Sequence, residues 1–125
     1  MFDMYEIIVV DDEPMIREGL KMALEMEGHN TTTASDGREA LRILDNKRPD
    51  LIITDIIMPE CDGIEVICSV KERSPNTKIM AISGGGRINA KDHLKIAKQL
   101  GACSVMTKPF STEELLLEIE KIFLT

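Results

Sequence analysis

The strongest constraint on the fold is a strict alternation of short strand-like runs with segments of helical periodicity. The runs are apolar or β-branched and stop abruptly, as strands buried on both faces of a sheet do. They cover residues 7–10, 31–34, 51–54, 79–83 and 104–107, and a helical segment follows each of them. Five strand-helix units in this order predict an α/β fold, a doubly wound five-stranded parallel sheet with five helices on its two faces.

The ends of the helical segments carry recognisable signals. Pro14 suits the first turn of a helix, because its missing N–H would be unpaired there in any case. Ser35 or Asp36 can cap the second helix. Ser111, with Glu114 three residues later, fits the reciprocal pattern of a capping box at the start of the last helix.

Length and charge limit the possible functions. The chain has 125 residues and a net charge of −7, enough for one domain over residues 1–125, with no separate output domain expected. The negative balance disfavours direct binding of nucleic acid and favours cations and basic protein surfaces. A membrane-spanning helix needs roughly 20 apolar residues, and the apolar runs here are far shorter. With no signal-peptide pattern at the start of the chain, a cytoplasmic location is expected.

The cysteines do not indicate a metal site. Cys61, Cys68 and Cys103 are odd in number and lack the spacing of zinc ligands. We therefore expect reduced, partly buried thiols in a reducing compartment.

Polar side chains follow four of the five predicted strands. Asp11 and Asp12 come after the first strand, Asp55 ends the third, Ser83 ends the fourth and Lys108 ends the fifth. In open parallel sheets, ligands bind beyond the carboxyl ends of the strands. Residues that are far apart in the sequence are therefore expected to meet at one rim of the sheet.

These residue types together fit phosphoryl transfer. Three converging carboxylates repel one another unless a cation is bound, and Mg²⁺ prefers oxygen ligands of this kind. A carboxylate can act as the nucleophile and become an aspartyl phosphate. Lys108 and the Ser83 hydroxyl could then hold phosphoryl oxygens. Each residue alone is more often a cap, a turn or a solvated charge, so the inference depends on the whole set.

Five motifs in order extend this pattern over nearly the whole chain. They are Val9-Val10-Asp11-Asp12-Glu13-Pro14, Ile53-Thr54-Asp55-Ile56-Ile57-Met58-Pro59, Asp62-Gly63, Ser83-Gly84 and Lys108-Pro109-Phe110. With these motifs, the chain resembles the response-regulator receiver domains of two-component signalling. The resemblance implies the flavodoxin-like receiver fold with strand order 2-1-3-4-5.

The resemblance also implies roles for individual residues. Asp55 is expected to be the phosphoacceptor and also a Mg²⁺ ligand. Asp12 is the expected direct Mg²⁺ ligand beside it, with Asp11 holding metal-bound water. The backbone carbonyl of Ile57 is the expected third protein ligand. Lys108 is the expected charge partner and forms a cis peptide bond with Pro109.

The resemblance further implies a switching mechanism and partners. Ser83 is the expected switch hydroxyl, which moves toward the phosphoryl group. The phosphodonor is expected to be a sensor histidine kinase or a histidine phosphotransfer protein, and the output a protein target. The expected docking surface combines Met15 and Ile16 with the loops that carry Pro59 and Phe110. Neither insertion into a membrane nor direct contact with nucleic acid is expected, and the chain is expected to be a monomer or a weak dimer.

Three positions depart from the family pattern. Val105 stands where an aromatic residue is common, so the loop of Gly84 to Gly86 is expected to close over the phosphoryl group instead. Ile57 and Gly85 carry no polar side chain that could position an attacking water. Slow self-hydrolysis of the phosphorylated form is therefore expected, and Ile57→Asn would change its lifetime.

Two other functions fit parts of the sequence. A Mg²⁺-dependent phosphohydrolase would also use an aspartyl phosphate, but it commonly has an acidic residue two positions after the nucleophile, where this chain has Ile57. A scaffold of receiver fold that is never phosphorylated is disfavoured by the complete set of Asp12, Asp55, Ser83 and Lys108. The favoured function is a signalling switch rather than an enzyme with turnover.

Overall fold

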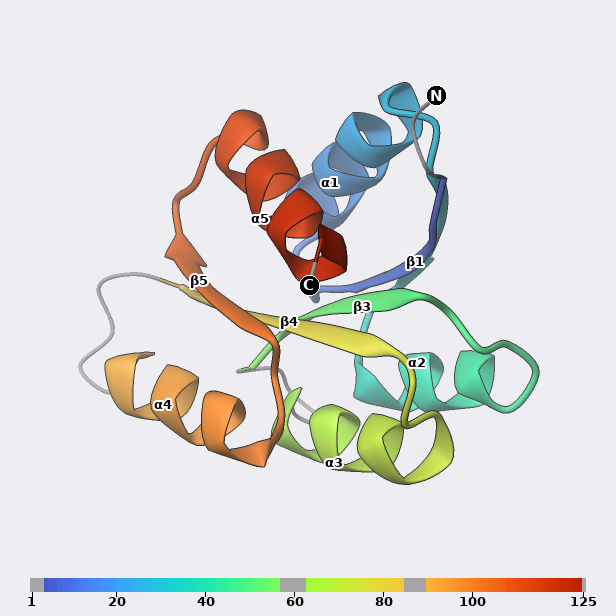
Figure 1. Ribbon diagram of the computed structural model, residues 1–125, viewed down its shortest axis with the longest axis vertical. Coiled ribbons are helices and arrows are strands. Elements are labelled where there is room, and N and C mark those ends of the chain that lie inside the picture. The colour runs from blue at the N-terminus through green and yellow to red at the C-terminus, as the bar shows by residue number, and fades with distance from the viewer. Residues whose placement is uncertain (1–3, 57–62, 85–89, 125) are drawn as a thin grey trace.

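A computed structural model describes residues 4–56, 63–84 and 90–124 of the chain, which form five strands that alternate with five helices (Figure 1). The strands are β1 (Glu6–Val10), β2 (Asn30–Ala34), β3 (Leu51–Asp55), β4 (Lys78–Gly84) and β5 (Ser104–Lys108). The helices are α1 (Pro14–Met26), α2 (Gly37–Leu44), α3 (Gly63–Arg73), α4 (Ala90–Leu100) and α5 (Thr112–Leu124). No helix among the described residues is long and apolar enough to cross a membrane.

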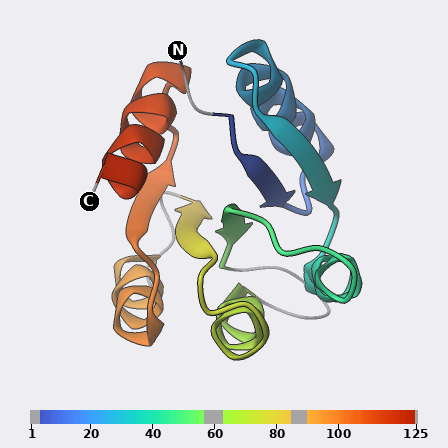
Figure 2. The same ribbon diagram turned by 45° about the vertical axis from the view of Figure 1, so that its right-hand side comes forward.

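The strands form one parallel sheet in the order β2-β1-β3-β4-β5, which confirms the predicted topology. Helices α1 and α5 cover one face of this sheet, and α2, α3 and α4 cover the other (Figure 1). Viewed from another side, β2 and β5 lie at the two edges of the sheet (Figure 2). The three central strands are therefore buried on both faces, which explains their unbroken apolar runs.

The alternation of side chains along each strand divides the core into two clusters. Ile8 and Ile52 point toward α2, α3 and α4, where they pack with Val66 and other apolar residues. Ile7 and Ile53 point the opposite way and pack under α1 and α5. Because the side-chain period of a strand is two, a register shift of one residue would exchange the two clusters. The register of the sheet, and with it the level at which each strand ends, is therefore strongly specified.

Capping interactions fix where two helices begin. The Asp36 carboxylate accepts a hydrogen bond of 2.9 Å from the Glu39 N–H, so Asp36 is the cap of α2. At α5 the predicted capping box is present. The Glu114 N–H donates to Ser111 Oγ at 3.0 Å, and the Ser111 N–H donates to the Glu114 carboxylate at 3.2 Å. Pro14 lies in the first turn of α1, as predicted.

The cysteines differ in part from the prediction. Cys68 and Cys103 carry free thiols, but both are exposed, so the expectation of partial burial was wrong for these two residues. Cys68 lies on the solvent side of α3, and Cys103 precedes the edge strand β5, so neither faces a core cluster. Cys61 lies outside the described residues.

Gly63 determines how α3 packs against the end of β3. Its N–H donates to the Ile56 carbonyl at 2.8 Å. A Cβ atom at this position would lie 2.5 Å from Ile56 Cα and would also overlap the Asp55 carbonyl. These neighbours are backbone atoms, so relieving the overlap would require the main chain to shift at a cost in free energy. Only glycine therefore allows α3 to begin this close to Asp55.

We predict that Gly63→Ala lowers the free energy of unfolding by at least about 2 kcal/mol, because the added methyl group forces the backbone apart. Gly19→Ala is the matched control, since nothing lies within 4 Å of a Cβ at this exposed position in α1. Alanine there is expected to be neutral or to stabilise the helix by up to about 1 kcal/mol. Urea unfolding measures both, and equal effects of the two substitutions would contradict this account of Gly63.

Candidate functional site

The carboxyl ends of the strands bring the predicted site residues to one rim of the sheet. Asp55 is the last residue of β3 and pairs with Ile82 of β4, so Ser83 lies one residue beyond it. Lys108 is the last residue of β5 and pairs with Gly84. Asp11 directly follows β1, and its N–H donates to the Ala34 carbonyl of β2 at 3.2 Å. All five strands thus contribute to the geometry of this edge.

Lys108 is the centre of the site. Its ammonium group donates to Asp11 Oδ2 at 2.9 Å, to Asp55 Oδ2 at 3.0 Å and to Glu13 Oε1 at 3.3 Å. Only 11% of the Lys108 side chain is exposed, while Glu13 is mostly exposed. The structure therefore brings together Asp11, Asp55 and Lys108 as predicted, in a direct and partly buried contact.

The pKa of Lys108 reflects two opposing effects. Burial of the ammonium group lowers it, but hydrogen bonds and charge interactions with Asp11 and Asp55 outweigh burial, so the pKa lies well above the usual lysine range. A lysine with a raised pKa stabilises the fold fully at every pH below its unfolded pKa of about 10.4, and this contribution is lost only as the pH rises through the folded pKa. Lys108 is therefore a fixed positive charge at neutral pH.

The loop between β1 and α1 is held in place by Asp11. Its carboxylate accepts a hydrogen bond from the Glu13 N–H at 2.9 Å, in addition to the one from Lys108. The Arg17 guanidinium donates to the Asp11 carbonyl at 2.9 Å and ties the loop to the first turns of α1. These contacts orient a buried carboxylate that would otherwise be unpaired, and they position Asp12 beside it.

Four carboxylates come close enough to share a cation. Asp11, Asp12, Glu13 and Asp55 each offer an oxygen atom, and these atoms lie within 4.8 Å of one another. Asp11 and Asp55 are buried, whereas Asp12 and Glu13 are exposed. A set of oxygen donors only, partly open to solvent, suits a hard divalent cation that keeps several waters. The residues present therefore fit a metal ion of this class.

Glu13 had no assigned role in the sequence analysis. It belongs to the run Asp11-Asp12-Glu13, and its place next to two predicted ligands was the only signal available. The structure adds its carboxylate both to the acidic cluster and to the contacts of Lys108.

Ser83 has an unusual environment. It is fully buried in β4, and its Oγ has no hydrogen-bond partner among the described residues. A buried hydroxyl without a partner costs free energy, because it has lost water and gained nothing in return. The predicted switch hydroxyl is therefore the one that the described structure leaves unsatisfied at this rim.

Some predicted residues cannot be placed. Ile57, Pro59, Asp62, Gly85 and Gly86 lie outside the described residues, so the predictions that depend on them are not tested by the structure. Two others are placed. Val105 is half-buried and packs against the core cluster under α2, α3 and α4, and the peptide bond between Lys108 and Pro109 is cis, as predicted.

Residues 7–120 match the response regulator receiver domain family. The chain belongs to this family. The receiver domain functions in two-component signalling, in which response regulators receive phosphoryl groups from histidine kinases. This agrees with the family resemblance that the motifs at the strand ends indicated.

Individual relatives agree with this assignment. The receiver domain is 38% identical over 120 residues to the alkaline phosphatase synthesis transcriptional regulatory protein PhoP of Bacillus subtilis, covering 94% of this chain and 48% of PhoP. It superimposes on the receiver domain of NtrX from Brucella abortus with a TM-score of 0.87 and 34% identity, covering 95% and 98% of the two chains. For chemotaxis response regulator CheY4 of Vibrio cholerae, the TM-score is 0.84 at 31% identity, with 97% and 100% covered. The chain spans about half the length of the curated relatives it matches.

We predict that Lys108→Met lowers the free energy of unfolding by about 3 kcal/mol at pH 7, because it leaves two buried carboxylates without their cationic partner. Lys121→Met is the control, since Lys121 is 72% exposed and has one ion pair of 3.4 Å with Glu118. That change should cost less than about 1 kcal/mol.

Urea unfolding at several pH values measures these differences. Because Lys108 remains protonated, its contribution in the wild type should stay constant between about pH 6 and pH 9. A divalent cation added at millimolar concentration should restore part of the lost stability of Lys108→Met. A loss no larger than that of Lys121→Met would contradict a structural role for the Lys108 contacts.

Proposed function

We propose that this receiver domain accepts a phosphoryl group on Asp55 with the help of Mg²⁺, and that phosphorylation switches its contacts with other proteins. The observation that carries the proposal is the contact of Lys108 with Asp55 and Asp11 inside a cluster of four carboxylates. A structural salt bridge alone would not need Asp12 and Glu13 at the open side of the same cluster. Their oxygen atoms provide what a divalent cation requires.

In the proposed reaction, an Asp55 carboxylate oxygen attacks the phosphorus of a phosphohistidine in a partner protein. A P–O bond to Asp55 forms as the P–N bond breaks, and the electron pair stays with the imidazole of the donor, which takes up a proton. Bound Mg²⁺ supplies positive charge to the transferring phosphoryl oxygens. Asp12 and Asp55 would hold the ion directly, and Asp11 would hold it through water. The Ile57 carbonyl would be the third protein ligand.

Lys108 contributes at the same step. The Lys108 ammonium group can exchange its hydrogen bond to the Asp55 carboxylate for one to an oxygen of the new phosphoryl group, while it keeps its hydrogen bond to Asp11. Stabilisation by a preorganised charge costs little reorganisation when the reaction occurs. The ammonium group that offsets the negative charge of the carboxylates in the resting site thus also offsets the negative charge of the phosphoryl group.

Ser83 and the segment after it form the proposed switch. The Ser83 hydroxyl has no partner among the described residues, so it gains a hydrogen bond when a phosphoryl oxygen comes within reach. Val105 is half-buried and branched, and it cannot reproduce the movement of a large aromatic ring. We therefore assign the response to Ser83 and to the backbone of Gly84 to Gly86.

The phosphodonor is proposed to dock on the first helix beside the acceptor. A cavity of about 320 Å³ lies between α1 and the start of α5, and its lining includes Met15, Ile16, Lys108 and Phe110. Because Lys108 both lines this cavity and contacts Asp55, a protein seated there would reach the acceptor. A sensor histidine kinase or a histidine phosphotransfer protein is the proposed occupant.

The output is proposed to be binding of a downstream protein by the phosphorylated domain in the cytoplasm. Residues 1–125 act as one receiver unit in this proposal, and the domain promotes its own phosphorylation and slow dephosphorylation without turnover of another substrate. The sheet and its rim contain the acceptor chemistry, whereas the surface helices are available for partners.

We predict that incubation with Mg²⁺ and acetyl phosphate adds one phosphoryl group to the protein, measured as a mass gain by intact mass spectrometry. Asp55→Asn and removal of divalent cations with EDTA should each abolish the gain. Asp50→Asn is the matched control, because Asp50 lies at the other end of β3 and accepts a hydrogen bond from the Glu6 N–H at 2.8 Å. A folded protein that gains no mass would favour the function of an unphosphorylated scaffold.

We predict that Ser83→Ala separates stability from switching. The substitution removes a buried hydroxyl without a described partner, so the free energy of unfolding should stay equal or rise by about 1 kcal/mol. Phosphorylation should still occur, but the change in amide hydrogen exchange of β4 that accompanies it in the wild type should be lost. A large loss of stability would show instead that the hydroxyl is satisfied in the resting protein.

A further inference from the structure

Thr54 is a polar residue in a part of the sheet that is closed to water. It follows the apolar residues 51–53 of β3 and is fully buried. A valine at this position would have almost the same shape without a polar group. Burying a hydroxyl costs free energy unless the hydroxyl makes a hydrogen bond. The hydrogen bond that Thr54 makes therefore indicates the role of its hydroxyl.

The hydroxyl of Thr54 donates to the backbone carbonyl of the proposed acceptor. The distance from Thr54 Oγ1 to the Asp55 carbonyl oxygen is 2.9 Å, and the direction is fixed because a carbonyl oxygen only accepts. The N–H of the same peptide group belongs to Ile56, and it donates to the Ile82 carbonyl of β4 at 2.9 Å. The peptide group that follows Asp55 is thus held by hydrogen bonds on both of its edges.

The start of α3 closes the space around this carbonyl. A Cβ atom at Gly63 would overlap the Asp55 carbonyl oxygen, so the backbone of Gly63 already lies against it. The Gly63 N–H donates to the next carbonyl along the chain, that of Ile56, at 2.8 Å. Asp55 as a whole is only 5% exposed. Little room is left for a water molecule to replace the Thr54 hydroxyl.

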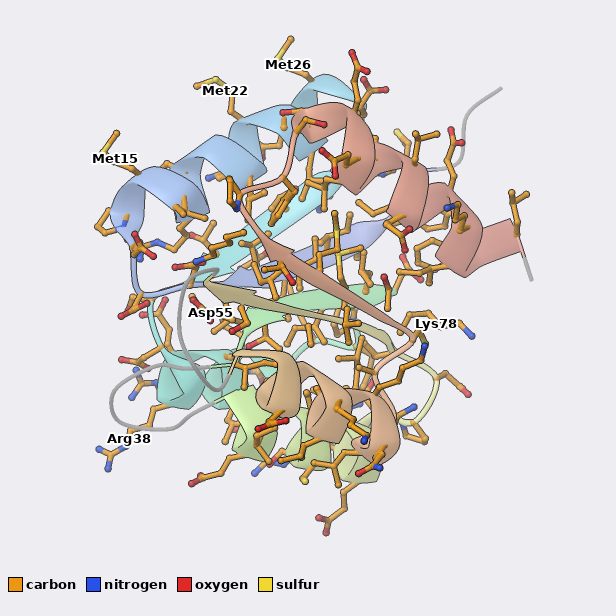
Figure 3. The ribbon with its side chains drawn as sticks, turned by 90° about the vertical axis from the view of Figure 1, so that its left-hand side faces the viewer. Met15, Met22, Met26, Arg38, Asp55 and Lys78 are labelled. Carbon is orange, nitrogen blue, oxygen red and sulfur yellow. The ribbon has the colours of Figure 1, made fainter. Side chains whose placement is uncertain are left out.

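The side chains of Thr54 and Asp55 point to opposite faces of the sheet, because successive residues of a strand alternate. Thr54 shares its face with Ile52, which packs under α2, α3 and α4. Figure 3 shows Asp55 at the end of the sheet opposite to Lys78, the first residue of β4. The Asp55 carboxylate accepts there from Lys108 at 3.0 Å. The Thr54 hydroxyl therefore influences this carboxylate through the backbone of Asp55.

The backbone contact affects the direction of the carboxylate. Because a peptide group is planar, the torsion angle ψ of Asp55 relates the plane of the following peptide group to the Cα–Cβ bond. With that plane held by Thr54 and Ile82, and Oδ2 held by Lys108, the side chain is fixed at its base and at its tip. A misplacement of about 1 Å can slow a reaction by about 10²-fold. A loose peptide group would therefore slow attack by the Asp55 oxygen.

We propose that Thr54 is a positioning residue for the acceptor, and that its hydroxyl holds the Asp55 backbone in the orientation from which the carboxylate attacks phosphorus. This role rests on the proposed acceptor function of Asp55. It gives the Thr54 hydroxyl no contact with the metal ion or with the phosphoryl group. Thr54 thereby differs from Ser83, whose hydroxyl has no partner among the described residues and is assigned to the response after phosphorylation.

The first test follows phosphorylation of the complete chain by acetyl phosphate and Mg²⁺, with intact mass measured over time. Thr54→Val keeps the shape and removes the hydroxyl, so it should lower the rate constant by about tenfold. Thr54→Ser keeps the hydroxyl and should recover most of the rate. Thr31→Val is the matched control, because Thr31 is also a buried threonine of a strand and its hydroxyl has no partner among the described residues. It should keep the wild-type rate.

The second test does not depend on phosphorylation. Amide hydrogen exchange, read by NMR, reports on the Ile56 N–H, which belongs to the same peptide group as the Asp55 carbonyl. In Thr54→Val this amide should exchange several-fold faster than in the wild type, with the Ile53 amide of the same strand as the reference. Thr54→Ser and Thr31→Val should exchange like the wild type. Both tests are made at a temperature at which circular dichroism shows every variant to be folded.

Several outcomes would overturn the proposal. These are equal rates for the wild type and Thr54→Val, an equal loss of rate in Thr31→Val, or no recovery in Thr54→Ser. Unchanged exchange of the Ile56 amide in Thr54→Val would show that the hydroxyl does not hold the peptide group. If the wild type gained no phosphoryl group while Thr54→Val still exchanged faster, the acceptor function of Asp55 would be overturned and the Thr54 contact supported.

Discussion

The contact between Lys108 and the two buried carboxylates is the interaction on which the rest of the structure depends. Lys108 is 97 residues from Asp11 and 53 from Asp55, so the contact exists only when the whole sheet is assembled in register. Two buried carboxylates without a cation would destabilise the rim by several kcal/mol. The positive charge of Lys108 is therefore needed in the resting protein, and the same ammonium group is available to a phosphoryl group at Asp55.

The helices around the sheet have two kinds of task. The start of α3 is packed so tightly on the end of β3 that only Gly63 fits, which fixes the backbone of Asp55. The outer side of α1 is the opposite case, since its large apolar side chains Met15, Met22 and Met26 are mostly exposed. Ser83 is buried in β4, and its hydroxyl has no hydrogen-bond partner in the part of the chain that the structure describes.

Much of the fold and of the candidate site was predictable from the sequence, because abrupt changes in polarity mark the ends of the strands. Asp55 and Lys108 were predicted at the ends of β3 and β5, and both close those strands. The sequence allowed either Ser35 or Asp36 as the cap of α2. Only the hydrogen bond from the Glu39 N–H to the Asp36 carboxylate identified Asp36 as the cap. The exposure of Cys68 and Cys103 was not predicted, because cysteine is usually buried and its type gives no information on which side of an element it faces.

The sequence by itself determined the order of the elements, the apolar faces and the residue types at the strand ends, since these depend on local periodicity and on side-chain chemistry. Only the tertiary structure decided which of those residues touch. It added Glu13 to the contacts of Lys108 and left the Ser83 hydroxyl without a described partner. It also turned three methionines outward in one row. The physical reason is that contacts between distant residues depend on sheet register and helix rotation, which are set by packing of the whole core rather than by any local pattern.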